Sequence, residues 1–267
     1  MPNSGLTQEN YYDRTDLFSV SQVKSFMDCE ERALAEIDGR YARPHSDALT
    51  LGSYIDVRLT GTDAEVDAFR EGHPEMFSSR GPTKGQLKAE YRSADEMVAR
   101  IWQDSDAGGL FARFLEGDRQ RIVTGEINGH AFKGKLDVLN LDKGFICDLK
   151  TVKSIRETWW RDGGKWDFIH YWRYDLQGAV YQELVYQQTG RRLPFYIAAV
   201  SKETPSDIGV YQVTQDELDA ALGQIPAEWL DRIERIKNGE ERPTRCGKCD
   251  WCRGTKVVTQ PEILDVL

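Results

Sequence analysis

Residues 121–151 read RIVTGEINGHAFKGKLDVLNLDKGFICDLKT, and this stretch decides the fold. Asn128-Gly129 is typical of a two-residue hairpin turn, so the flanking residues predict antiparallel strands over 121–127 and 131–140. A third strand is expected over 145–149, after a turn at 141–144. The stretch therefore predicts the start of a sheet in which consecutive strands lie side by side.

Two carboxylates and a lysine lie near the ends of these strands. Asp148 and Lys150 are two positions apart and share one face of a strand, and the hairpin can bring Asp137 beside Asp148. Carboxylates suit Mg²⁺ or Mn²⁺, and a nearby lysine can orient or deprotonate water for phosphodiester hydrolysis. The alternative is an edge strand whose aspartate and lysine are solvated.

The remaining pattern predicts helices around a mixed sheet, which is an α/β (α+β) fold class. Helices are expected over 21–38, 46–59, 63–70, 94–104, 110–115, 168–188 and 215–237, and further strands over 193–200 and 208–213. Without a linker or repeat, we expect one domain over 1–267. It would comprise a mostly helical part over 1–120, a core of sheet and helices over 121–237, and a cysteine-rich tail over 238–267 that packs back on the first helix.

Composition narrows the function classes. The chain has 267 residues, of which 40% are hydrophobic, and this excludes a disordered or fibrous protein. No apolar run reaches the roughly 20 residues that cross a bilayer, and the N-terminus is polar, so we expect no membrane contact and a cytoplasmic location. The net charge of -9 repels nucleic acid as a whole, so any contact with nucleic acid needs a local patch.

The strand motif resembles the PD-(D/E)XK nuclease superfamily, and more closely its exonuclease branch typified by RecB, RecE and lambda exonuclease. The matching residues are 134–137 (GKLD) and 146–151 (ICDLKT). The resemblance implies a restriction-endonuclease-like core in which Asp137 and Asp148 hold the metal and Lys150 is the catalytic lysine. The resemblance covers roughly residues 20–256, and over this range the chain looks like the exonucleases of phages and prophages.

Two more motifs are similar to those of the RecB-like group. Gln177 and Tyr181 look like its Gln-x-x-x-Tyr motif, and their spacing of four places them on one helical face, toward the strand ends and a DNA backbone. Residues 52–56 have the spacing of its Gly-x-x-x-His motif, with Asp56 where the group has a metal-binding histidine; a carboxylate is compatible with Mg²⁺. The alternatives are a buried core tyrosine and a surface aspartate.

The chain has five cysteines, an odd number that disfavours a disulfide framework in a reducing compartment. Cys246, Cys249 and Cys252 have the spacing of a loop that wraps one metal centre. Three thiols need a fourth ligand, and the arrangement resembles the iron-sulfur nucleases related to AddB and to the CRISPR adaptation exonucleases. That resemblance implies that Cys29 completes a 4Fe-4S cluster. The last gap is shorter here, so Zn²⁺ is the alternative, while Cys147 is expected in the core.

Basic and aromatic side chains alternate after Lys150. Cations that neutralise phosphates beside rings that stack on bases indicate a single-strand channel or end-wedge. The alternative is that the rings are core and the charges a solvated rim, and we expect some of each. The candidate DNA-binding residues are Lys153, Arg156, Trp159, Trp160, Arg161, Lys165 and Arg173.

These expectations combine into a Mg²⁺- or Mn²⁺-dependent deoxyribonuclease. By resemblance it is an exonuclease that resects linear double-stranded DNA ends for phage-type recombination, with a single-strand annealing recombinase as partner, in the cytoplasm of a bacterial host. The alternatives are a single-strand or structure-specific iron-sulfur nuclease like the CRISPR adaptation exonucleases, and a catalytically idle nuclease fold that binds DNA. Related exonucleases form rings, so a ring-like homo-oligomer is compatible with the sequence, which does not fix digestion polarity.

Overall fold

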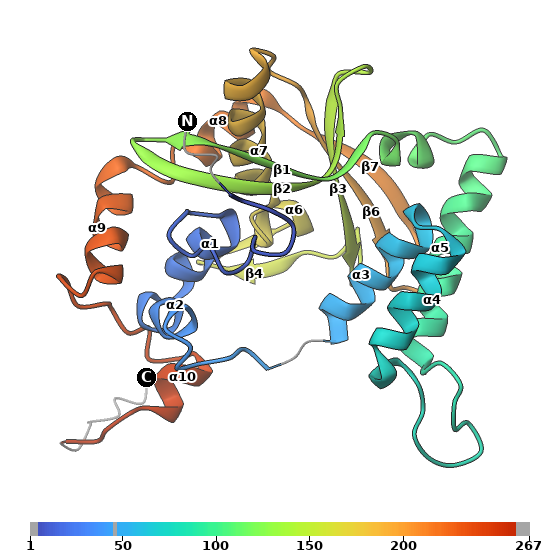
Figure 1. Cartoon of the computed structure of the whole chain (residues 1–267), viewed down its shortest axis with the longest axis horizontal. Coiled ribbons are helices and arrows are strands. Elements are labelled where there is room, and N and C mark those ends of the chain that lie inside the picture. Colours follow the sequence, from blue (N-terminus) through green and yellow to red (C-terminus); the bar gives the residue numbers. More distant parts are fainter. Residues whose placement is uncertain (1–4, 45–46, 260–267) are drawn as a thin grey trace.

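The computed structural model describes residues 5–44 and 47–259. Its centre is a five-stranded sheet of order β1-β2-β3-β6-β7 (Figure 1). β3 and β6 are parallel and the other neighbours are antiparallel, which confirms the expected mixed sheet. The strands are β1 (Asp118–Ile127), β2 (His130–Asn140), β3 (Phe145–Val152), β6 (Phe195–Ser201) and β7 (Ile208–Val213).

The β1–β2 hairpin turns where the sequence indicates. Asn128 has φ 51° and Gly129 has φ 84°, the left-handed pair that a type I′ turn requires. β2 pairs with β3 only from Val138 to Asn140, so the first half of β2 has one edge that β3 does not cover. Phe18 covers that free edge: its N–H donates to Ala131 O (2.9 Å), and its carbonyl accepts from the N–H of Lys133 (2.8 Å).

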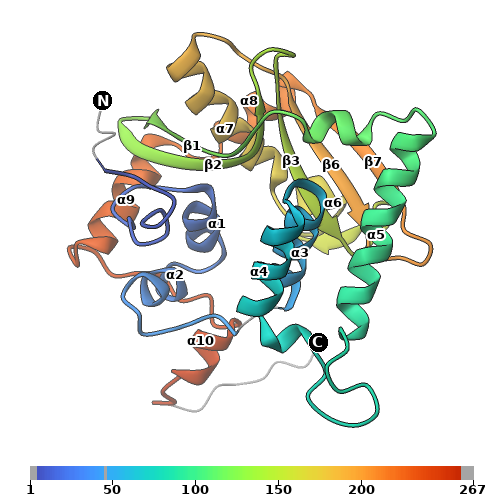
Figure 2. The same cartoon turned by 45° about the vertical axis from the view of Figure 1, so that its right-hand side comes forward.

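Helices cover both faces of the sheet (Figures 1 and 2). One apolar core joins α1 (Val20–Asp28), α7 (Tyr174–Thr189), α8 (Gln215–Leu222) and α9 (Ala227–Lys237) to one face. A second core joins α3 (Asp47–Thr60), α5 (Ala89–Asp106) and a 3-10 turn (Phe111–Leu115) to the other face. The remaining helical elements are α2 (Glu30–Ile37), α4 (Asp63–Gly72), a 3-10 turn (Pro74–Met76), α6 (Phe168–Tyr171) and α10 (Asp250–Gly254).

Each of three long predicted helices is in fact two helices. The helix expected over 21–38 divides into α1 and α2 at Cys29, whose backbone is extended (φ −169°, ψ 111°). The helix expected over 168–188 divides into α6 and α7 at Arg173, which is left-handed (φ 52°). The helix expected over 215–237 divides into α8 and α9 before Pro226, because a proline has no N–H for a helical hydrogen bond and restricts the residue before it.

A short hairpin was not predicted from the sequence. β4 (Trp159–Arg161) pairs with β5 (Gly164–Trp166) around the left-handed pair Asp162 (φ 52°) and Gly163 (φ 79°). The residues expected to open α3 include Ser46, which lies outside the described residues, as do residues 260–267 of the predicted tail. No helix of the described residues is long and apolar enough to cross a membrane.

Candidate active site

Asp137 and Asp148 lie where β2 and β3 part. The regular pairing of the two strands ends with the pair Val138 and Cys147, and the two aspartates are the next residues beyond that pair, one on each strand. Asp137 Oδ2 accepts a hydrogen bond from the N–H of Leu149 at 3.0 Å. The Asp137 carboxylate thus accepts the hydrogen bond that a backbone carbonyl of β2 would accept in a regular strand pair. This bond holds the carboxylate beside Leu149, between Asp148 and Lys150.

Lys150 is the charged partner of Asp148. Asp148 is 2% exposed, and Lys150 Nζ forms an ion pair with its Oδ2 atom. Burial raises the pKa of Asp148 to about 7; Lys150 opposes this rise, and the charge of Asp137 adds to it. Burial opposes the charge of Lys150, but the carboxylates of Asp148 and Asp137 outweigh it and raise the pKa of the lysine. The site therefore contains buried negative charge that one ammonium group only partly offsets.

Gln177 and Tyr181 reach this pair from α7. Gln177 Nε2 donates to Asp148 Oδ1 (2.8 Å) and to the hydroxyl of Tyr181 (3.2 Å). The helix approaches β2 closely because Gly134 has no side chain: a Cβ atom there would lie 3.0 Å from the Tyr181 ring. Asp148 and Gln177 are therefore fixed relative to each other by sheet and helix rather than by a loop.

Asp56 on α3 completes a set of three carboxylates. Gln120 Nε2 lies 3.4 Å from Asp56 Oδ2 and 3.2 Å from Asp137 Oδ1, so the two carboxylates face one amide nitrogen. Asp56 is also ion-paired with Arg119. Gln120 stands opposite Asp137 in the strand register and has φ 50°, an uncommon conformation for a residue other than glycine. Strained backbone of this kind gathers at functional sites.

Sequence reasoning missed Lys24, Arg119 and Gln120. Lys24 on α1 donates to the carbonyl of Trp172 (2.9 Å), and its ammonium lies 5.2 Å from the centre of the Tyr174 ring. Lys150 Nζ lies 4.9 Å from the same ring, so two ammonium groups border one aromatic side chain. No local signal marks Lys24, because only the packing of α1 against α7 brings it here. The left-handed Gln120 also has no sequence signature.

The donor set fits a hard divalent cation. Oδ2 of Asp148 is a buried carboxylate oxygen with no hydrogen-bond donor of good geometry among the described residues, and its neighbour is the Lys150 ammonium. Asp56 and Asp137 direct further carboxylate oxygens to one amide nitrogen. Oxygen ligands of this type bind Mg²⁺ or Mn²⁺.

Four cysteines form a second group with metal-binding potential. Sγ atoms of Cys29, Cys246, Cys249 and Cys252 all lie within 4.8 Å of one another, so the cluster could bind a metal. It lies at the junction of α1, α2 and the tail. Cys147 lies apart from it, fully buried in β3.

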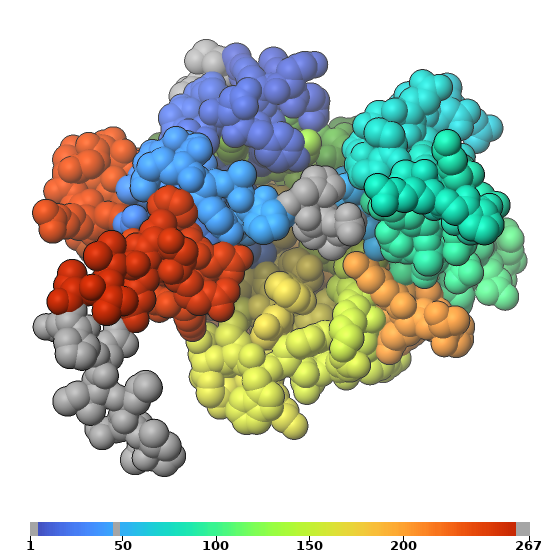
Figure 3. Space-filling view, turned by 90° about the horizontal axis from the view of Figure 1, so that it is seen from below, coloured from blue at the N-terminus to red at the C-terminus, as the bar shows by residue number. Residues whose placement is uncertain are grey.

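The predicted DNA-binding segment divides into exposed and internal residues. Trp160, on the β4–β5 hairpin, is 67% exposed, and Lys165 Nζ lies 5.9 Å from its ring. Lys153 and Arg156 are exposed and pair with Glu157 and Asp207. The others have internal contacts: Trp159 packs on the core, Arg161 donates to the carbonyls of Tyr171 and His170, and Arg173 pairs with Asp28. Figure 3 shows this segment (yellow) as a rim, with the surface hollowed between it and the N-terminal helices and tail.

The fold and these side chains define the protein class. The mixed central sheet flanked by helices is consistent with a PDDEXK-like fold, and Asp137, Asp148 and Lys150 lie where two of its strands part. The model of one family, the PDDEXK-like domains of unknown function (DUF3799), matches residues 19–255, and the chain belongs to this family. The expected PD-(D/E)XK relationship is confirmed.

Solved structures agree with this assignment. A crystal structure from Eubacterium rectale, described as "Putative exonuclease", is 39% identical to this chain, with a TM-score of 0.86 over 97% of this chain and 96% of that one. The family and this neighbour together support a nuclease. Another solved structure, SSO0001, aligns at 13% identity over 86% of this chain and 93% of that one, with a TM-score of 0.29, too low to bear on the argument. No curated protein matches the chain.

Proposed function

We propose that this protein is a metal-dependent deoxyribonuclease that acts as an exonuclease on the ends of linear double-stranded DNA. The observation that carries the proposal is the convergence of Asp137, Asp148 and Lys150 where β2 and β3 separate. Membership of the PDDEXK-like family and similarity to the Eubacterium rectale protein support it. Buried charge is costly, and a phosphate-cleaving centre is a physical reason to maintain it.

The proposed roles follow from where each side chain lies. Asp56, Asp137 and Asp148 would hold Mg²⁺ or Mn²⁺, and the bound ion would polarise the scissile phosphate and lower the pKa of water. Lys150, as an ammonium, would orient the attacking water and a phosphate oxygen. Gln177 keeps the Asp148 carboxylate in one orientation, and its hydrogen bond to Tyr181 holds the amide in place.

DNA contacts would come from the exposed part of the aromatic segment. Trp160 and Lys165 are paired with each other across the two-stranded β4–β5 finger, with Lys153 and Arg156 nearby in the chain. Cations neutralise phosphates and an exposed indole stacks on an unpaired base, so the finger suits a DNA end where strands open. Trp159, Arg161 and Arg173 would support this surface through their contacts inside the fold rather than contact DNA directly.

The wider setting is an extension of the same proposal. An exonuclease of this type produces single-stranded DNA, which a single-strand annealing recombinase would consume, in a phage or prophage context within a bacterial cytoplasm. A ring-like homo-oligomer stays a prediction. A second candidate is a single-strand or structure-specific nuclease, which the four clustered cysteines favour because their arrangement resembles that of the CRISPR adaptation exonucleases.

The experiment compares four DNA substrates in Mg²⁺ and in Mn²⁺: a duplex labelled at its 5′ ends, the same duplex labelled at its 3′ ends, a covalently closed circle and a single strand. The proposal predicts loss of the linear duplex with the circle intact, and the labels give the polarity. Cleavage of the single strand alone supports the second candidate. Nicking of the circle would contradict the exonuclease assignment. DNA binding with no cleavage of any substrate would indicate an idle nuclease fold.

A further inference from the structure

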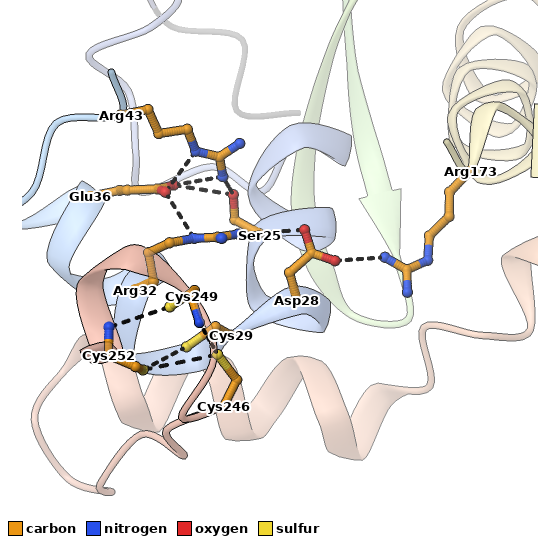
Figure 4. Close-up of polar contacts among 10 residues, drawn as sticks. All are labelled: Ser25, Asp28, Cys29, Arg32, Glu36, Arg43, Arg173, Cys246, Cys249 and Cys252. Carbon is orange, nitrogen blue, oxygen red and sulfur yellow. Dashed lines mark hydrogen bonds and ion pairs between the residues drawn. The ribbon is translucent and has the colours of Figure 1, made fainter. Parts of the chain in front are cut away.

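The four clustered cysteines differ in geometry from what an iron-sulfur cluster needs. Cys29 Sγ lies 3.5 Å from Cys252 Sγ, and Cys246 Sγ lies 4.0 Å from Cys252 Sγ. All four sulfur atoms lie within 4.8 Å of one another, and none is in a disulfide. Figure 4 shows the four side chains pointing toward one another.

A single tetrahedral ion fits the spacing. Zinc–sulfur bonds are about 2.3 Å long, so the edge of a ZnS₄ tetrahedron is about 3.8 Å. The sulfur pairs at 3.5 and 4.0 Å bracket that edge. In a 4Fe-4S cluster each thiolate binds a different iron, and the cube of irons and sulfides stands between the thiolates. Sulfur atoms that all lie within 4.8 Å leave room for one ion and not for a cube.

The surrounding backbone supports a closed site. The N–H of Cys249 donates to Cys246 Sγ (3.3 Å), and the N–H of Cys252 donates to Cys249 Sγ (3.4 Å). Hydrogen bonds of this kind stabilise thiolates and orient them toward a metal. Four thiolates without an open position form a structural site rather than a catalytic one. A groove of about 660 Å³ borders Cys29 and Cys246 and gives a path for metal entry.

We propose that Cys29, Cys246, Cys249 and Cys252 hold one structural Zn²⁺ ion, and that this chain lacks the 4Fe-4S cluster that its resemblance to the AddB-related nucleases implies. The ion joins the α1–α2 junction to the tail. Other contacts hold the same junction: Glu30 accepts from the N–H of Thr244 (2.7 Å) and pairs with Arg232 on α9. The extended backbone of Cys29, which ends α1 and precedes α2, directs its thiol to the tail.

The zinc site has a structural connection to the active site. Asp28, next to Cys29, pairs with Arg173 (3.2 Å), the left-handed residue that precedes α7, and Figure 4 shows this contact beside the thiols. α7 carries Gln177, and α1 carries Lys24. The ion therefore stabilises the position of the helices that border the carboxylates, while contributing no ligand to the reaction.

The test measures metals in the full-length protein purified without oxygen from iron-replete cells. The proposal predicts about one zinc and no stoichiometric iron or sulfide per chain, a colourless solution, and visible bands typical of tetrahedral cobalt–thiolate when Co²⁺ replaces Zn²⁺. A brown protein with iron and acid-labile sulfide would overturn it. So would a folded protein with neither metal.

Matched variants assign the metal to these residues. Cys249→Ser should lower the bound zinc at least tenfold and expose the tail to limited proteolysis, whereas Cys147→Ala, at the one cysteine outside the cluster, should keep full zinc. If Cys249→Ser fails to fold, the anaerobic metal content of the wild-type protein still decides between zinc and iron. None of these readouts depends on cleavage, so failure of the proposed nuclease function would leave the zinc result intact.

Discussion

The side chain of Asp137 and the backbone of Leu149 are joined by a 3.0 Å hydrogen bond that crosses from β2 to β3. It lies one step beyond the last regular strand pair, Val138 with Cys147. One aspartate therefore has two tasks. Its oxygen completes the strand contact, and its charge contributes to the proposed metal site.

Substitutions at Asp137 should separate these tasks. Asp137→Asn keeps an oxygen that can accept from the N–H of Leu149 but loses the charge, so we expect cleavage to fall by about 10²-fold or more with little change in stability. Asp137→Ala loses the acceptor as well and should cost about 1 kcal/mol in the free energy of unfolding. Urea denaturation and cleavage rates measure the two effects. Equal stability of the two variants would show that the hydrogen bond contributes nothing.

Gln177 should affect the catalytic rate more than stability. Gln177→Ala frees the Asp148 carboxylate to rotate, and misplacement of a catalytic group by about 1 Å can cost about 10²-fold in rate. Tyr181→Phe removes only the second acceptor of the Gln177 amide and should cost about fivefold. Steady-state kinetics should show the loss in kcat rather than in KM. Gln188→Ala is the control, because Gln188 lies on the same helix and bonds the carbonyl of Thr124, away from Asp148. Comparable losses in the Gln188 and Gln177 variants would contradict this role.

Lys24 should make stability depend on pH. Burial lowers the pKa of Lys24 to about 7, and the charge of Lys150 adds to this effect. An unfolded lysine has a pKa of about 10.4, so between these values the unfolded chain binds more protons and the free energy of unfolding rises with pH. Lys24→Met removes this contribution. Relative to that variant, the wild type should therefore gain stability from pH 7 to about pH 10.

Denaturant midpoints measured at several pH values check this prediction. Lys153→Met, at an exposed lysine, is the control for loss of a lysine charge at the surface. Parallel pH profiles for the wild type and Lys24→Met would contradict this prediction, because they would show that folding does not lower the pKa of Lys24.

Trp160 should contribute to DNA affinity without contributing to stability. It is 67% exposed at the β4–β5 hairpin, and stacking of a base on an exposed ring is worth about 1–3 kcal/mol. Trp160→Ala should therefore raise the Kd for single-stranded DNA about fivefold or more, with an unchanged thermal midpoint. Trp102→Ala, at a 42% exposed tryptophan on α5, is the matched control for fluorescence anisotropy measurements. Equal effects of the two substitutions would argue against a stacking role for the finger.

The sequence was sufficient for the sheet because its signals are local. Asn128-Gly129 marks the turn, and the runs around it become β1 and β2. The third strand is longer than expected, 145–152 rather than 145–149, because its parallel pairing with β6 continues to Val152. Asp162-Gly163 carries the same kind of local signal for the β4–β5 hairpin, but the strands on either side are only three residues long and show no clear alternation.

The long-range parts of the site were not predictable in this way. The break at Cys29 follows from where the tail packs, through contacts such as the Glu31 N–H to the Thr244 carbonyl (3.1 Å). The Gln120 link between Asp56 and Asp137 needs a left-handed residue inside a strand, which no propensity indicates. Periodicity also cannot distinguish a basic residue that faces solvent from Arg161 and Arg173, which bond inside the fold.

The most direct test of the central claim is the rate at which the protein cleaves an end-labelled linear duplex in Mn²⁺, compared with Asp148→Asn. Asp142→Asn, at an exposed aspartate in the turn between β2 and β3, is the matched control. We predict that cleavage by Asp148→Asn falls by about 10²–10⁴-fold, while Asp142→Asn cleaves like the wild type. Unchanged cleavage by a folded Asp148→Asn variant would contradict the assignment of the carboxylate cluster as the nuclease centre.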